Sequence, residues 1–403
     1  MRTRKRLLAV IMVIAMFATV FTGCGGGTST ASNQSSTASG NTSDANKDNS
    51  ANSNSSANNS GSSQTASKAK TVTIPSIDVT VNSDGTRTIT DNADKKVTVP
   101  ATINSYVESW FAHNAVDCML EGARGMVVTC AKPDSYKWMY MICPNISNAE
   151  YMEFSDSMNV EAILAKKPDI VFGSNENYRA MFENVGLPFV NVQFADYQGM
   201  ARCIALTAEI FGDDAKKIST EYLNYLNSMI EKVNGVVGNI PDSEKVSVLH
   251  GDNLSNYTVD GANTIINEWI EYAGGVNAPG KNNEVSGNKQ SVNIEQILSW
   301  DPDIIISGAN QEEVDKIMSD TAWANIKAVK NKKVVLNPKG IFTWDRYAVE
   351  EALQLVWAAQ LFYPDKTSGL DIVKETQSFF KKFFNYDLTA DQVNLMLQRK
   401  NPA

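Results

Sequence analysis

NVEAILAKKPDIVFGS (residues 159–174) returns 134 residues later as NIEQILSWDPDIIISG (residues 293–308), and this pair of stretches decides the fold. Seven of the sixteen aligned positions are identical. In each copy an asparagine stands where it can cap a helix. A proline ends that helix, because proline disfavours helical backbone in the residue before it. An apolar run follows at once, so each copy predicts a short helix that leads directly into a buried strand.

The segments around the two copies continue this alternation of strands and helices. Before and around the first copy, we expect strands at residues 105–110, 126–130, 170–172 and 189–193 and helices at 115–120 and 162–166. Around the second copy, we expect strands at 246–249, 304–306 and 334–336 and helices at 264–272, 294–299 and 349–362. Residues 198–234 predict helix broken near Gly212, and residues 78–100 predict a β-hairpin. The pattern predicts two α/β lobes with parallel sheets and helices between them.

The first 24 residues have the pattern of an export signal. Four cationic residues precede an apolar run at positions 7–20, which is shorter than the roughly 20 residues of a membrane-spanning helix, and Cys24 follows. The segment resembles a bacterial lipoprotein signal that ends at a cysteine to be lipidated, although Phe21 stands where leucine is usual. An ordinary signal peptide or a membrane anchor is the alternative. Residues 25–70 contain no aromatic residue and no Val, Leu, Ile or Met, which predicts a disordered Ser/Asn-rich tether.

The composition excludes some partners. The net charge is −9 at pH 7 and the part after residue 70 has no basic cluster, so nucleic acid is not expected to bind. The length of that part is large for one core and suits two lobes. Its four cysteines lack CxxC spacing, and buried free thiols are expected rather than disulfides. These are Cys118, Cys130, Cys143 and Cys203.

Several segments together resemble a known family. Besides the two repeated stretches, they are ITDNADKKVTVP (89–100), NEWIEYAGGVNA (267–278), WANIKAVKNKKVVLNP (323–338) and ALQLVWAAQLFYPD (352–365). In order and spacing they are similar to the class III substrate-binding proteins of ABC importers, which serve ferric siderophores, haem and cobalamin. The resemblance covers the chain from about residue 88 onward. It implies two Rossmann-like lobes joined by a rigid helical bridge, a ligand cleft between the lobes, no enzymatic activity and no cofactor.

The resemblance also implies a membrane partner, an ABC permease homodimer with its ATPase. Glu161 and Glu295 match the surface glutamates that the family presents to arginines of the permease. Two similar lobes can offer the same acidic contact to each half of a symmetric dimer, and carboxylate–arginine pairs fix the register of such a contact. The local alternative is that each glutamate occupies the first turn of a helix, where the helix dipole favours a negative charge.

Ligands of open parallel sheets bind beyond the carboxyl ends of the strands, and the loops expected there are rich in aromatic residues. A large, flat or apolar ligand could stack on them. The expected ligand is a metal complex: an iron siderophore, haem or a cobalamin-like compound. The candidate ligand-binding residues are Trp110, His113, Trp138, Tyr140, Asn175, Tyr178 and Arg179 in the first lobe and His250, Tyr257, Trp344 and Arg346 in the second.

The chain has only two histidines, and each follows the first expected strand of its lobe. His113 and His250 could therefore converge as axial ligands of a haem iron or a corrin cobalt. Local hydrogen bonding or exposure to solvent is the alternative. Arg179 and Arg346, from opposite lobes, could contact ligand carboxylates or be ordinary surface residues.

Other function classes fit the sequence less well. A zinc or manganese receptor would gather more than two histidines. A surface-anchored hydrolase would need a nucleophile motif, and the chain has no Gly-x-Ser-x-Gly elbow and no Walker loop. A surface scaffold without a permease is a further alternative. We expect a protein held by lipid on the extracytoplasmic face of a bacterial membrane, divided into signal peptide (1–24), tether (25–70), N-terminal lobe with its hairpin (71–197), helical bridge (198–238) and C-terminal lobe (239–403).

Overall fold

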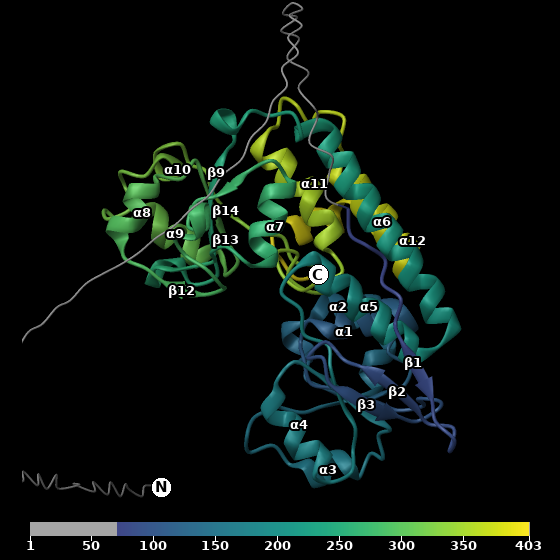
Figure 1. Ribbon diagram of the computed structural model, residues 1–403. Helices are drawn as coiled ribbons and strands as arrows, with labels where there is room; N and C mark the ends of the chain where they lie inside the picture. The colour runs from purple at the N-terminus through teal and green to yellow at the C-terminus, as the bar shows by residue number, and fades with distance from the viewer. Residues whose placement is uncertain (1–70, 403) are drawn as a thin grey trace, which may run out of the picture. The chain divides into compact units, whose positions relative to one another are not determined.

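The computed structural model describes residues 71–402 (Figure 1). The predicted signal peptide, Cys24 and tether lie outside these described residues. Among the helices of residues 71–402, none combines the length and the apolar character that crossing a membrane requires.

A small antiparallel sheet opens the described chain. It contains the predicted hairpin and one further strand, in the order β1-β2-β3. Gly85, with φ of 84°, makes the turn between the first two strands, a conformation that glycine adopts without strain. In the second turn Asp91 accepts hydrogen bonds from the backbone N–H groups of Ala93 and Lys95, both at 3.0 Å. The strands are β1 (Val79–Val81), β2 (Arg87–Thr90) and β3 (Lys96–Val99).

The first lobe contains a five-stranded parallel sheet in the order β6-β5-β4-β7-β8. Helix α2 covers a segment that the sequence analysis placed in a loop. Its residues KWMYMI bury Trp138, Met139 and Ile142, so tertiary packing selects helix for a run too short to show a clear period. The strands are β4 (Tyr106–Glu108), β5 (Met126–Thr129), β6 (Glu150–Tyr151), β7 (Ile170–Gly173) and β8 (Phe189–Asn191), and the helices are α1 (His113–Glu121), α2 (Lys137–Ile142), α3 (Val160–Leu164) and α4 (Glu176–Glu183).

The second lobe contains a four-stranded parallel sheet in the order β11-β9-β13-β14, with a two-stranded ribbon, β10-β12, beside it. Its strands are β9 (Ser247–Gly251), β10 (Thr258–Val259), β11 (Val276–Asn277), β12 (Gln290–Ser291), β13 (Ile304–Ser307) and β14 (Val334–Leu336). Its helices are α7 (Ile265–Tyr272), α8 (Ile294–Trp300), α9 (Gln311–Ser319) and α10 (Lys327–Lys330).

The repeated stretch occupies the same place in both lobes. It forms α3 and β7 in the first lobe and α8 and β13 in the second. Strand β7 pairs with β4, the first strand of its sheet, and β13 pairs with β9, the first strand of the other. The predicted caps are present: Asn159 accepts from the N–H of Ala162 at 3.1 Å and Asn293 from that of Gln296 at 2.8 Å. The sequence prediction of two equivalent helix–strand units is confirmed.

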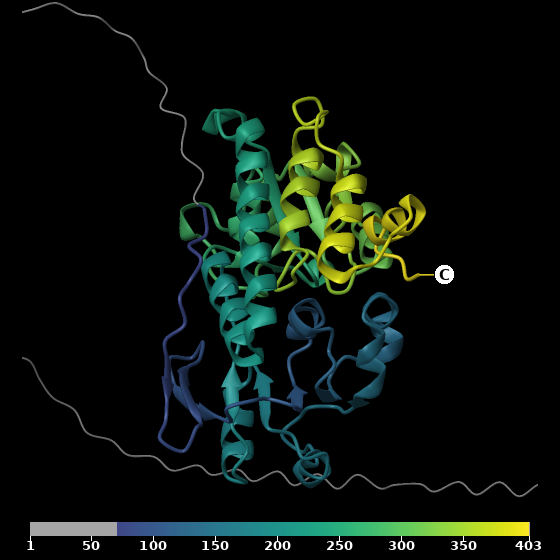
Figure 2. The ribbon, with the colours of Figure 1, turned by 90° about the vertical axis from the view of Figure 1, so that its right-hand side faces the viewer.

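Two consecutive helices follow the first lobe, α5 (Tyr197–Phe211) and α6 (Asp213–Val237). Helix α6 contacts α1 of the first lobe and also α7 and α11 (Glu351–Phe362) of the second part. Figure 2 shows α6 as the long teal helix that runs beside the C-terminal helices. These are α12 (Ile372–Phe384) and α13 (Ala390–Leu397). One buried apolar cluster extends through all these elements, so the two sheets are held by packed helices. The exact domain boundaries stay a prediction.

Each of the two parallel sheets is covered on both faces. The large cluster covers one face of each sheet, and two smaller clusters cover the other faces. In the first lobe Phe182 stacks on Phe189, with ring centroids 6.3 Å apart. In the second lobe Tyr257 stacks on Trp323 at 6.0 Å. The fold is therefore the predicted α/β arrangement of two lobes with parallel sheets.

Candidate functional site

Aromatic side chains from the two lobes meet beyond the carboxyl ends of their strands. Trp110 follows β4, Phe194 follows β8, and Tyr347 lies in the segment between β14 and α11. Each of the three pairs of ring centroids is 5.5 Å apart. The position of this aromatic cluster is the one that open parallel sheets use for ligands.

A second contact between the lobes lies at Tyr136. This ring stacks on Phe342 of the other lobe, with centroids 5.9 Å apart and 7° between the planes, and on Phe111 at 6.2 Å. The Lys339 ammonium lies 5.1 Å from the same ring and donates to the carbonyl of Ser135 at 3.0 Å. Phe111 keeps 48% of its surface exposed, so part of this surface faces solvent.

A pocket of about 610 Å³ opens next to this second contact. One wall is formed by Asp134 and Ser135 of the first lobe. The other wall comes from the second lobe and the C-terminal segment, and consists of Ala309, Asn310, Gln311, Leu336, Lys339, Gln398, Arg399, Lys400 and Asn401. Strands β13 and β14 end at this wall, so the pocket lies where the fold predicts a ligand.

The charge of this pocket is unbalanced. Three cations, Lys339, Arg399 and Lys400, face one carboxylate, Asp134. Partial burial and the nearby charge of Arg399 lower the pKa of Lys339. Arg399 donates hydrogen bonds to neutral acceptors, the carbonyl oxygens of Asn337 and Gly308. An anion in the pocket would relieve the repulsion between these cations.

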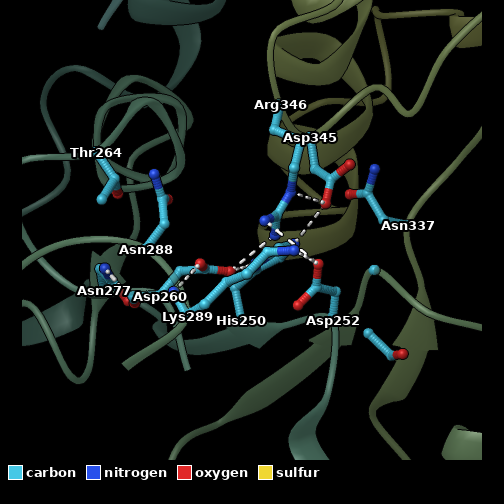
Figure 3. Close-up of polar contacts among 12 residues, drawn as sticks. His250, Asp252, Asp260, Thr264, Asn277, Asn288, Lys289, Asn337, Asp345 and Arg346 are labelled. Carbon is cyan, nitrogen blue, oxygen red and sulfur yellow. Dashed lines mark hydrogen bonds and ion pairs between the residues drawn. The ribbon is translucent and has the colours of Figure 1, made fainter. Parts of the chain in front are cut away.

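A second polar cluster lies at the end of β9 and centres on His250 and Arg346 (Figure 3). His250 Nδ1 is 2.8 Å from Asp260 and its Nε2 is 3.0 Å from Asp345. Arg346 donates to Asp260 at 2.8 Å and lies 3.5 Å from Asp252 and 3.4 Å from Asp345. Burial acts to lower the pKa of His250, but the hydrogen bonds and charges of the two aspartates raise it above its ordinary value. This cluster holds Tyr347, the residue after Arg346, at the contact between the lobes.

Neither histidine offers a free ring nitrogen to a ligand between the lobes. His113 is fully buried and its ring nitrogens lie 2.6 Å from Glu108 and 2.8 Å from Thr207. His250 is equally buried and engaged by two aspartates. The reason is that His250 lies within β9 itself and His113 begins α1 shortly after β4, so both side chains are buried in the core. This placement contradicts the interpretation of the two histidines as a pair of axial ligands.

Arg179 is also committed to the protein. It lies in α4, not in a loop, and only 5% of its surface is exposed. Its guanidinium pairs with Asp91 and Glu176 and donates to the carbonyl of Phe189 at 3.0 Å. The hydrogen bond from Arg179 lowers the pKa of Glu176 to about 2. A ligand carboxylate would have to displace these partners.

The other predicted ligand residues divide into those near the pocket and those in structural positions. Trp138 donates to the carbonyl of Lys400 at 2.9 Å and so holds the C-terminal wall of the pocket. Tyr140 donates to the carbonyl of Ala131 at 2.8 Å. Four residues serve local structure: Asn175 caps α4, Tyr178 packs on Phe154, Tyr257 stacks on Trp323, and Trp344 is fully buried.

Sequence reasoning missed several residues that the structure brings to this region. Tyr347 and Phe194 lie next to predicted loop residues, and their aromatic character was the available signal. Lys339 follows the predicted strand at 334–336 directly. Arg399 gave no signal, because it lies 62 residues from Asn337, whose carbonyl it contacts. Only the packing of the C-terminal segment brings it to the pocket.

Comparison with known proteins finds similar sequences. Residues 153–339 match the periplasmic binding protein family. The molybdate-binding protein MolA of Haemophilus influenzae is 27% identical over 334 residues, which cover 76% of this chain and 93% of that protein. A cobalamin-binding protein of Halobacterium salinarum is 26% identical over 165 residues, or 40% of this chain and 43% of that one.

Solved structures share the fold. The crystal structure of a periplasmic solute binding protein from Veillonella parvula aligns with a TM-score of 0.63 and 24% identity, covering 77% of this chain and 97% of that chain. The family match at residues 153–339 includes both copies of the repeated stretch. Residues 153–339 of this chain therefore match the periplasmic binding protein family, and the chain has the fold of a solved periplasmic solute binding protein.

Proposed function

We propose that this chain is the solute-binding protein of an ABC importer, and that it captures a compact anionic metal compound in the pocket between its lobes. Such a ligand is an oxyanion of a metal or a negatively charged metal chelate. The proposal narrows the metal complexes expected from the sequence toward those that carry negative charge. No reaction is proposed in the pocket, which binds its ligand and releases it to the transporter.

One observation carries the proposal: the pocket holds three cations that have no carboxylate partner. Within residues 71–402, no ion pair joins Lys339, Arg399 or Lys400 to an aspartate or a glutamate. Lys400 instead donates to the amide oxygen of Gln398 at 2.7 Å. Lys339 and Arg399 are half-buried and Lys400 is exposed. Half-buried cations are normally paired, so a site that brings two of them together beside a third cation favours an anionic partner.

The size of the pocket and the nature of the relatives support a compact ligand. About 610 Å³ lies within the usual range of small-molecule sites, roughly 300–1,000 Å³. A relative that matches 76% of this chain is a molybdate-binding protein, and molybdate is an anion. The cobalamin-binding relative matches less than half of the chain, and the buried histidines provide no axial ligand for a tetrapyrrole.

The test is a binding titration on the purified protein by calorimetry. Molybdate, tungstate, ferric citrate, haemin and cyanocobalamin are compared, with sulfate as a metal-free anion. We expect an anionic metal compound to bind best, with affinity that falls as salt rises. Lys339→Gln should weaken that binding about tenfold or more, whereas Lys330→Gln, which removes an exposed lysine of α10, should not. Preference for cyanocobalamin, or equal affinity in Lys339→Gln, would reject the anionic ligand.

The proposal includes docking to a permease through Glu161 and Glu295. Both side chains are exposed and both stand at the second position of a capped helix, α3 or α8. In the described part of the chain no ion pair is formed by either carboxylate. The two glutamates thus lie at equivalent, unpaired sites of two similar lobes, which suits a partner with two similar halves.

Docking is tested apart from ligand binding. The double change Glu161→Ala and Glu295→Ala should leave ligand affinity unchanged while ligand-dependent ATPase stimulation of the reconstituted importer falls. Glu312→Ala, an exposed glutamate in the first turn of α9, is the matched control. Unchanged stimulation in the double variant would exclude this docking mode. Membrane attachment through Cys24 is tested separately by loss of fatty-acid labelling in Cys24→Ser.

A further inference from the structure

A fully buried group of three metal-ligating side chains lies in the first lobe, away from the pocket. Glu108 ends β4, His113 begins α1, and Asp117 follows one helical turn later on the same face. One ligand atom from each lies within 4.8 Å of the others. His113 Nδ1 is 2.6 Å from Glu108 Oε2 and 3.5 Å from Asp117 Oδ1.

The hydrogen bonds around His113 decide which of its nitrogens carries the proton. The hydroxyl of Thr207, in α5, donates its single proton to the carbonyl of Cys203 at 2.9 Å. The oxygen of Thr207 can then only accept from His113 Nε2, which lies 2.8 Å away. In neutral His113 the proton is therefore on Nε2, and the lone pair of Nδ1 points at the two carboxylates. An acceptor nitrogen that faces acceptor oxygens needs a proton or a metal ion between them.

The two carboxylates differ in how the protein holds them. Glu108 Oε1 accepts from the backbone N–H of Trp110 at 2.6 Å, which leaves Oε2 facing His113. Asp117 has no exposed surface, and neither of its oxygens accepts a hydrogen bond. A buried carboxylate with no donor is costly, so Asp117 is the observation that points to a missing partner.

The protein supplies no permanent cation to this group. Within the described residues, no lysine or arginine pairs with Glu108 or Asp117, and burial raises the pKa of both carboxyl groups. The His250 group of the other lobe is the internal contrast, because Arg346 lies within 3.5 Å of all three of its aspartates. A divalent ion with two carboxylates and a neutral imidazole would have no net charge, which is what a dry core favours.

We propose that Glu108, His113 and Asp117 bind one divalent first-row transition-metal ion inside the first lobe. One imidazole nitrogen and two carboxylate oxygens suit ions such as zinc, cobalt or nickel. The Thr207 and Trp110 contacts orient two of the ligands, as outer hydrogen bonds do in metal sites. The ion would join β4 to α1, and the hydrogen bond between His113 and Thr207 would link this site to α5 at the beginning of the helical bridge.

The test uses the purified protein, freed of metal by a chelator in mild denaturant, refolded and titrated with Co²⁺. We expect one tightly bound Co²⁺ per chain, visible ligand-field absorption, and a thermal midpoint that rises with Co²⁺. X-ray absorption of the loaded protein should show one imidazole nitrogen among oxygen ligands. This last measurement needs no variant, so it stands even if a variant fails to fold.

Asp117→Asn and His113→Gln should each lower the Co²⁺ affinity at least tenfold. Asp117→Asn is the safer variant, because it keeps the shape of a side chain that accepts no hydrogen bond. His250→Gln, in the compensated group, and Lys339→Gln, in the pocket, should keep one bound Co²⁺. Failure of the refolded protein to bind Co²⁺ and Zn²⁺, as expected if a shared proton occupies the group, would overturn the proposal. Wild-type affinity in both variants would do the same.

Discussion

Trp110 of the first lobe and Tyr347 of the second lie ring against ring, with 5.5 Å between their centroids and 54° between their planes. Trp110 follows β4, the middle strand of its sheet, and Tyr347 lies in the segment after β14, an edge strand of the other. Phe194 closes the group by contacting both rings. The three rings therefore form a contact between the two lobes. The stability of each lobe does not depend on this contact alone.

Removing the Trp110 ring should affect ligand binding more than folding. Trp110→Ala is expected to weaken binding several-fold, because both lobes form the pocket and the variant loses two aromatic pairs at the contact between the lobes, each of which contributes about 0.5–1.5 kcal/mol beyond the area it buries. Calorimetric titration measures the effect. Tyr178→Ala is the matched control, since its ring contacts Phe154 inside one lobe. Equal loss of affinity in the control would show that the contact between the lobes has no special role.

Arg346 should be among the most important polar residues for stability. Arg346→Met leaves three aspartates with His250 and Lys289 as the nearby cations, and breaking a buried ion pair from one side typically costs about 3–5 kcal/mol. Urea unfolding measures the change. The comparison is Arg202→Met, whose pair with the exposed Asp94 should be worth about 0–1 kcal/mol. Similar losses in both variants would mean that the Arg346 network is not specially stabilising.

The buried carboxyl group of Glu350 should make the free energy of unfolding decrease as pH rises. Burial raises the pKa of its carboxyl group from 4.5 to about 7. Between these two values the folded protein holds a proton that the unfolded chain has lost, so the free energy of unfolding falls as pH rises and levels off above about pH 7. Urea unfolding across this range measures the slope.

Glu350→Gln is the matched change for that slope. Glutamine keeps an acceptor for the backbone N–H of Phe342, which lies 3.2 Å from Glu350 Oε1, and it does not titrate. The variant should therefore lose the part of the pH dependence between about pH 4.5 and 7. If the free energy of unfolding changes equally with pH in wild type and variant over this range, Glu350 is already ionised in the folded protein there.

The helix caps of the repeated stretch can be separated from the glutamates beside them. Asn293→Ala removes the side-chain oxygen that accepts from the backbone N–H of Gln296, whereas the backbone N–H of residue 293 can still donate to the Gln296 side chain; the loss should cost about 1 kcal/mol of stability. It leaves Glu295 in place, so ATPase stimulation by the folded variant should stay near wild type. A variant with normal stability would show that tertiary packing alone fixes this helix.

Much of the fold was predictable because it depends on local patterns. The repeated stretch, the broken helix at Gly212 and the small hairpin all rest on caps, turns and apolar periods that neighbouring residues settle between themselves. Helix α2 and helix α4 were missed, and with them the true setting of Trp138 and Arg179. These helices are short and amphipathic only toward partners that are distant in the sequence, such as Lys400 for Trp138.

The sequence by itself determined that two equivalent α/β units surround a helical bridge, because helix capping, proline and apolar runs act over a few residues. It also pointed to the loops in which the lobes meet. Which side chains lie at this contact between the lobes depends on the tertiary structure. It buried both histidines, bound Arg179 and Arg346 to carboxylates, and brought Arg399 beside Lys339. Electrostatic pairing depends on distances between residues far apart in the chain, and only packing sets those distances.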